Sequence, residues 1–173
     1  MLRLLLLPAL VLWAAPALAL DAVAYAYVEG GIPVLHFFSP ACEPPPPGEP
    51  PDIAECAYLE ISCGSDGATA IILRDVGSRD VSRWFAEPGG PASILTIGKT
   101  SFPLSLQRLG ANFLSGGWDV LFAGPYRAFS AIPPANLAAD SWGLKKLDAT
   151  LDFPVSGANR VPVETFVKAC GEP

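Results

Sequence analysis

The chain has 173 residues, of which 51% are hydrophobic and 16% are charged. That much apolar material excludes an intrinsically disordered protein and predicts one buried core, since a chain of this length forms one domain or at most two small ones. Acidic residues outnumber basic ones by 17 to 11, which argues against a nucleic-acid partner because a polyphosphate would be repelled.

The N-terminus has the pattern of a secretory signal peptide. A basic start at Arg3 is followed by an apolar run over residues 4–15 and by the small-residue cleavage motif Ala17-Leu18-Ala19. We therefore expect residues 1–19 to be removed and residues 20–173 to form a single β-rich domain in the periplasm or outside the cell. The alternative, a retained anchor, is disfavoured because the run is short for a bilayer; no mature membrane span is expected.

Strand patterns follow in two pairs. Residues 21–28 and 32–38 flank the turn signal Glu29-Gly30-Gly31, and residues 57–63 and 68–73 flank a second turn at 64–67. Each pair predicts a hairpin.

Between these pairs, residues 40–51 hold seven prolines, which cannot donate the hydrogen bonds of a sheet interior. We expect a stiff surface loop there, either without a partner or docking into an aromatic groove of another protein.

The second half of the chain mixes strands with two helices. Short strands are expected at 81–85 and 94–97. A helix is expected at 101–114, because Ser101 can cap it and Leu106, Leu109, Phe113 and Leu114 lie near helical spacing.

A strand at 118–122, a loop over 133–142, a strand at 147–153 and a closing helix at 162–170 complete the chain. The predicted fold class is mainly β with two short helices (α+β), as a small antiparallel β-sandwich or partly open barrel stapled by disulfides.

Four cysteines in an exported chain predict two disulfides. Cys42 and Cys56 bracket the proline-rich segment, while Cys63 ends a strand and Cys170 ends the last helix. We therefore expect Cys42–Cys56 and Cys63–Cys170, since Cys56 and Cys63 lie too far apart on one extended segment. The paired spacing of a zinc site is missing, and no metal or other cofactor is expected.

One family resemblance rests on short segments in order. These are Leu106-Gln107-Arg108-Leu109, then Trp118-Asp119-Val120-Leu121, then Leu151-Asp152-Phe153-Pro154-Val155-Ser156-Gly157 and a short helix ending at Cys170. Residues 57–171 resemble small exported proteobacterial envelope proteins, namely accessory proteins associated with type VI secretion and, more loosely, the invasion-associated locus B family. The resemblance implies an envelope protein without known catalysis, and it brings no catalytic residue.

Enzyme motifs do not assemble in the sequence. His36 is the only histidine and lies among apolar strand residues, and no G-x-S-x-G serine motif occurs. The expected disulfides consume the thiols. Asp148 and Asp152 alternate on a strand, which is typical of a solvated face rather than of a glycosidase pair. No catalytic residue is therefore predicted.

Aromatic residues are the remaining candidates for a site. They either fill the core or line a shallow groove for a peptide or glycan. The candidates are Trp84, Trp118, Trp142, Tyr58 and Tyr126. We single out Trp142, in an expected loop beside Lys145 and Lys146, as a contact surface for another envelope or secreted protein.

The sequence thus favours a non-enzymatic periplasmic accessory or binding module of the bacterial cell envelope. The alternative is an acidic periplasmic inhibitor of a basic secreted hydrolase such as a lysozyme, which the net negative charge would suit. The serine–glycine and lysine–glycine loop motifs associated with membrane-bound lysozyme inhibitors are missing.

Overall fold

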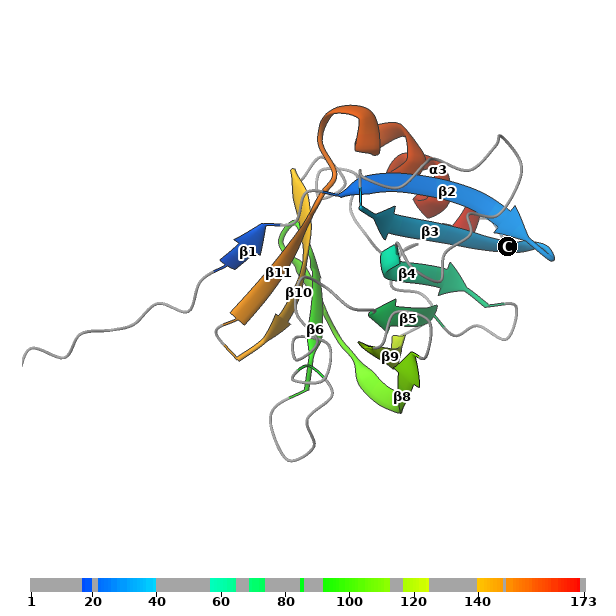
Figure 1. Ribbon diagram of the computed structural model, residues 1–173. Helices are drawn as coiled ribbons and strands as arrows, with labels where there is room; N and C mark the ends of the chain where they lie inside the picture. The colour runs from blue at the N-terminus through cyan, green and yellow to red at the C-terminus, as the bar shows by residue number, and fades with distance from the viewer. Residues whose placement is uncertain are drawn as a thin grey trace, which may run out of the picture.

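The computed structural model describes residues 17–19, 22–39, 57–64, 69–73, 85, 92–112, 117–124, 140–147 and 149–171. Over these residues the protein is mainly β, with its strands in two sheets and one short α-helix near the C-terminus (Figure 1). Neither sheet closes on itself among the described strands, so they do not form a closed barrel.

The larger sheet has six strands, and every neighbouring pair in it is antiparallel. In Figure 1 it descends from β2 at the top to β8 at the bottom. In spatial order the strands are β2 (Val23–Glu29), β3 (Ile32–Phe38), β4 (Ala57–Cys63), β5 (Thr69–Leu73), β9 (Gly117–Gly124) and β8 (Ser105–Asn112). The two predicted hairpins, β2–β3 and β4–β5, are confirmed, and so is the strand predicted at 118–122.

Local sequence explains the first hairpin. Gly30 and Gly31 form its turn with φ angles of +57° and +84°, a left-handed conformation that glycine adopts without steric cost. Alternation along β4 then buries Leu59 and Ile61 on one face, while Glu60 on the other face remains half-buried.

The smaller sheet has five strands. In spatial order they are β1 (Ala17–Ala19), β11 (Ala149–Pro154), β10 (Ser141–Lys146), β6 (Ile94–Ile97) and β7 (Thr100–Pro103). β1 pairs parallel with β11, and the other pairs are antiparallel. The strand expected at 94–97 is confirmed as β6. The strand expected at 147–153 is confirmed as β11 from Ala149 onward, whereas Leu147 lies in a turn. Phe85, the one described residue of the strand expected at 81–85, is instead helical.

The helix predicted at 101–114 is wrong, because the chain forms most of β7 and the whole of β8 there. A β-bulge explains the misleading spacing. Leu106 pairs with Phe122 and Leu109 pairs with Val120, but Arg108 pairs with Leu121, so β8 carries one extra residue between Leu106 and Arg108. The bulge puts two leucines three positions apart on the same face of a strand, as a helix would.

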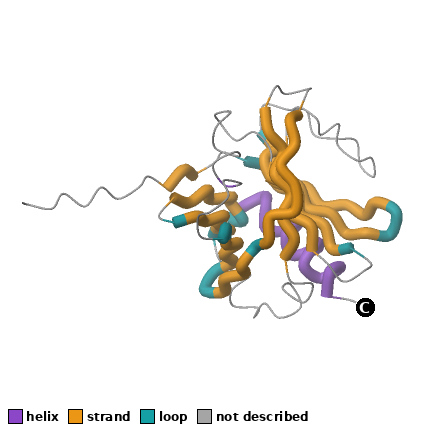
Figure 2. Tube along the Cα trace, turned by 90° about the horizontal axis from the view of Figure 1, so that it is seen from below, coloured by secondary structure: helices purple, strands orange, loops and turns teal. Residues whose placement is uncertain are grey.

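One continuous core joins both sheets and the helix. Its largest fully buried side chains come from β3, β4, β5, β9, β10, β11, β6 and the helix α3 (Arg160–Gly171). They are Trp142, Phe37, Phe122, Phe153, Phe166, Leu35, Leu59, Ile61, Ile71, Leu73 and Leu95. α3 confirms the closing helix predicted at 162–170 and packs against β2 and β3; Figure 2 shows it in purple beside the strands.

A buried asparagine fixes the entry to this helix. Asn159 ends the 3₁₀ turn η2 (Gly157–Asn159). Its side-chain oxygen accepts a hydrogen bond from the Ala24 N–H at 2.8 Å, and its amide nitrogen donates to the carbonyls of Ala22 and Pro154, each at 2.9 Å. One side chain therefore ties the start of α3 to β2 and to the end of β11.

The predicted Cys63–Cys170 disulfide is present, with the two Cα atoms 5.8 Å apart. It joins β4 to the last turn of α3. The other predicted disulfide, Cys42–Cys56, and the proline-rich segment at 40–51 lie outside the described residues. The second expected helix is not found at its predicted place, since the described residues of 101–114 form β7 and β8.

Candidate interaction surface

The contact surface predicted around Trp142 does not have the geometry that the sequence suggested. Trp142 lies in β10 rather than in a loop and is fully buried, with its ring edge-on to Phe37 at a centroid distance of 6.3 Å. Lys146 is 4% exposed, and its Nζ donates a hydrogen bond to the Phe85 carbonyl at 3.3 Å. Only Lys145 is exposed, so the expectation of an exposed tryptophan between two exposed lysines is wrong.

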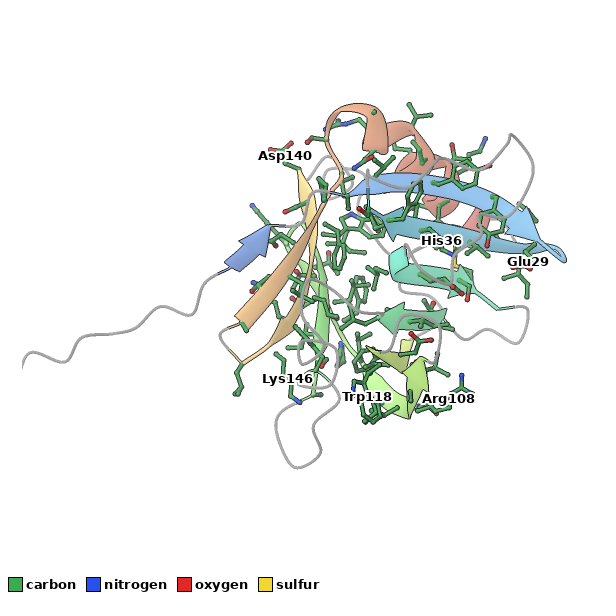
Figure 3. The ribbon with its side chains drawn as sticks, viewed as in Figure 1. Glu29, His36, Arg108, Trp118, Asp140 and Lys146 are labelled. Atoms are coloured by element: carbon green, nitrogen blue, oxygen red, sulfur yellow. A yellow bond between two sulfur atoms is a disulfide. The ribbon has the colours of Figure 1, made fainter. Side chains whose placement is uncertain are left out.

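Alternation along β10 gives the reason. Trp142, Leu144 and Lys146 share the face that packs on the core, while Lys145 points the other way. Lys146 stands at the end of that strand, at the lower end of β10 in Figure 3, where its ammonium group reaches a backbone carbonyl. The polar residues before Trp142 suggested a loop, yet Ser141 already pairs with Pro154.

His36 is the residue that an enzyme hypothesis would need, and it is fully buried in β3. Its Nε2 lies 3.4 Å from a carboxylate oxygen of Glu60 on β4, and its ring meets Tyr27 edge-on at a centroid distance of 5.3 Å. Among the described residues neither ring nitrogen has a well-formed hydrogen bond; the Glu60 contact is an ion-pair distance only.

The imidazole is packed inside the molecule. The imidazole has no solvent-accessible surface on which a substrate could be placed. Ser62 is the nearest serine in register, diagonal to His36 across the β3–β4 pair, and it makes no hydrogen bond to the ring. Within the part of the chain that the structure describes, no serine is therefore hydrogen-bonded to the histidine ring.

The predicted aromatic groove is not brought together by the described residues. Trp84 and Tyr126 lie outside them, and for Tyr58 only the backbone is described. Trp118 is half-buried on β9, where it pairs with Ala111 of β8 (Figure 3). Asp148 also lies outside the described residues, and Asp152 is half-buried on β11.

The structure offers a different surface, the free edge of β8, which we call the β8 edge. This strand runs for eight residues, Ser105–Asn112, and within the described part of the chain it pairs only with β9. Leu106 is 44% exposed and Leu109 is 39% exposed, although both lie on the face that carries the buried Val120 and Phe122. A strand edge with one unpaired row of backbone groups is a template for another strand.

The opposite face of the β8 edge carries a charged residue and a glycine. Arg108 is exposed and pairs with Leu121, and the next residue on the same face, Gly110, pairs with Asp119 of β9. A Cβ atom added at Gly110 would meet no atom within 4 Å, so the glycine leaves open space above the strand. The sequence signal for this surface was the Leu-x-x-Leu spacing, which suggested a helix instead.

Among the described residues there is no group of three or more histidine, cysteine, aspartate or glutamate side chains placed to hold a metal ion. No helix within the same ranges is both long and apolar enough to cross a membrane. Comparison with protein-family models, curated proteins and solved structures found no match to this chain.

Proposed function

We propose that this chain is an exported, non-enzymatic binding module of the cell envelope, and that it takes up an extended segment of a partner protein along the β8 edge. The observation that supports this proposal is the β8 edge itself, an eight-residue strand with two exposed leucines and no second neighbour among the described strands. Adding a strand there would pair the open row of backbone groups and cover Leu106 and Leu109. In this proposal the two sheets form a sandwich that presents the edge.

Two features support an oxidising compartment outside the cytoplasm. The Cys63–Cys170 disulfide joins β4 to α3 beside the core, and such bonds persist in exported proteins. Cleavage after Ala19 would remove β1, which lies at the end of the smaller sheet, without interrupting any other described strand.

A non-enzymatic role is supported by the complete burial of His36, the only histidine.

The alternative, an acidic inhibitor of a basic hydrolase, depends on other parts of the chain. The described residues contain six acidic and six basic residues, so their charges balance. The acidic excess lies elsewhere in the sequence, including residues 40–56, which hold four acidic residues and no basic one. An inhibitor that works by charge attraction would therefore use that segment rather than the β8 edge.

A photo-crosslinking experiment separates these two functions. The full chain is expressed with its own leader, carries a photo-crosslinking amino acid at position 107, and is irradiated in intact cells. We expect a crosslinked protein that is lost when Leu106→Thr and Leu109→Thr are added, and that is kept with Leu147→Asn, a change at an exposed leucine outside β8.

Crosslinking that persists in the Leu106→Thr/Leu109→Thr chain would contradict binding along the β8 edge. A basic hydrolase captured only through a probe at position 49, and released by salt, would support the inhibitor instead. The probe at position 49 lies within the acidic segment 40–56.

A further inference from the structure

We propose that the segment taken up by the β8 edge is the same strand of a second copy of this chain, so that two molecules join edge to edge about a two-fold axis at Leu109. This inference rests on the proposed function, since both use the β8 edge. Antiparallel pairing of β8 with itself would continue the six-stranded sheet of one copy into that of the other.

The apolar face of the β8 edge suits this register. When the two-fold axis passes through Leu109, the Leu109 side chains of the two copies are direct cross-strand neighbours on the face that carries Val120 and Phe122. Each is 39% exposed in the single chain. Val120 is the neighbour of Leu109 on β9, and the half-buried Trp118 pairs with Ala111, the next residue of β8 on the same face. The pairing therefore covers apolar surface that one copy leaves in water.

Charge complementarity on the other face selects the same register. With the axis at Leu109, Arg108 of the second copy stands directly opposite Gly110, and Asp119 is the next residue inward in that row. Two strand spacings amount to about 10 Å between backbones, which an extended arginine and an aspartate can bridge together. Gly110 has no side chain to block the approach, and symmetry forms this Arg108–Asp119 pair twice.

Neighbouring registers lose this complementarity. An axis at Arg108 would place the two arginines directly opposite each other, which is destabilising. An axis at Gly110 would set Arg108 opposite Asn112, so that Arg108 of the second copy would no longer stand in the same row as Asp119. An axis between two residues would put the apolar face of one copy and the polar face of the other on the same side of the joined sheet, because side chains alternate along a strand.

Gly110 gives an independent reason for an approaching chain. The open space within 4 Å of an added Cβ shows that packing inside one copy does not require glycine there, and its φ angle is not positive. Glycine within a strand weakens it, and it often marks a place where another backbone or ligand comes close. In the proposed dimer the Arg108 side chain of the second copy extends across Gly110.

Sedimentation equilibrium of the full chain, recovered from the periplasm after export with its own leader, tests the proposal. We expect a monomer–dimer equilibrium whose dissociation constant rises about tenfold or more in Arg108→Glu and in Asp119→Arg, because each change replaces two attractions by two repulsions. Combining Arg108→Glu with Asp119→Arg should restore dimerisation. Lys99→Glu, a charge reversal at an exposed residue of the β6–β7 turn, should leave it unchanged.

Gly110→Val provides a variant that the single chain can accommodate, since its side chain enters open space. We expect this variant to fold and to lose the dimer. A folded chain that stays monomeric at every concentration, a dimer that survives Gly110→Val, or a folded double charge reversal that remains monomeric would overturn the inference. A monomer that crosslinks from position 107 to a different protein would overturn the dimer alone and leave the proposed function standing; a monomer without any crosslink would overturn both.

Discussion

The two ends of the six-stranded sheet are built in opposite ways. At the β2–β3 end, α3 packs against the strands, the Asn159 side chain is hydrogen-bonded to the backbones of Ala22 and Ala24, and Cys170 is bonded to Cys63. At the β8 end the last strand has only β9 beside it in the described part of the chain, and its two leucines are 44% and 39% exposed.

The contrast separates stability from association. The covered end combines a helix, a disulfide and buried hydrogen bonds, which are contacts that resist unfolding. The open end keeps two partial defences against uncontrolled pairing, the bulge between Leu106 and Arg108 and the charge of Arg108. These two features restrict which strand can pair with β8, and they leave the part of β8 that follows the bulge able to pair with another strand.

Breaking the disulfide tests the covered end most severely. The bond spans a sequence separation of 107 residues. Chain entropy assigns about 4.7 kcal/mol to a loop of that size. Cys63→Ala with Cys170→Ala should lower the free energy of unfolding by about that amount, measured by urea denaturation. The matched control, Cys42→Ala with Cys56→Ala, should cost less, about 3 kcal/mol if those two cysteines are paired. A larger loss from the control would contradict the assignment of stability to the α3 end.

Asn159→Ala attacks the same end through its hydrogen bonds. Three bonds to Ala22, Ala24 and Pro154 are lost, and the freed backbone groups are in a buried setting, so we expect a loss of about 3 kcal/mol in the free energy of unfolding. Asn159→Asp keeps the acceptor for the Ala24 N–H but turns an oxygen toward two carbonyls, and it should not rescue stability. Gln107→Ala, at an exposed side chain of β8, is the control and should have no measurable effect.

The covered end was also the more predictable one. Alternating apolar residues and the Gly30-Gly31 turn predicted the β2–β3 hairpin, and the end of a strand and of a helix predicted the Cys63–Cys170 bond. These signals are local, or depend on a single pair of cysteines. Asn159 gave no sequence signal, because its partners Ala22 and Ala24 lie 137 and 135 residues away and bind through their backbones.

At the β8 end the sequence pattern gave a wrong prediction, and the reason is physical. Leu106 and Leu109 have helical spacing, and only the pairing with β9 shows that an extra residue in a bulge puts them on one face of a strand. Trp142 failed similarly, since pairing of Ser141 with Pro154 extends β10 into residues that resemble a loop. Strand pairing is a long-range property, so short windows of sequence do not determine it.

Leu147 is an exposed leucine outside the β8 edge, and no binding role is proposed for it. It is 66% exposed and has a φ of +55°, a left-handed conformation that is unfavourable for a leucine and much better tolerated by asparagine. Leu147→Asn should therefore raise the free energy of unfolding by about 1 kcal/mol, seen as a rise of about 2–4 °C in the melting temperature. Lys145→Asn, at an exposed residue of the same hairpin with ordinary strand backbone, should give no such rise.

The smallest expected effect on stability belongs to the β8 edge, where the proposals expect the largest effect on association. Leu109→Thr removes an exposed leucine but supplies a β-branched residue that suits a strand, so the free energy of unfolding should stay within about 0.5 kcal/mol of the parent chain. At the covered end, Phe166→Ala empties a fully buried site and should cost about 3–5 kcal/mol under the same urea titration. If Leu109→Thr destabilised the chain as much as Phe166→Ala, Leu109 would be a core residue, and its exposure could not be attributed to a binding role.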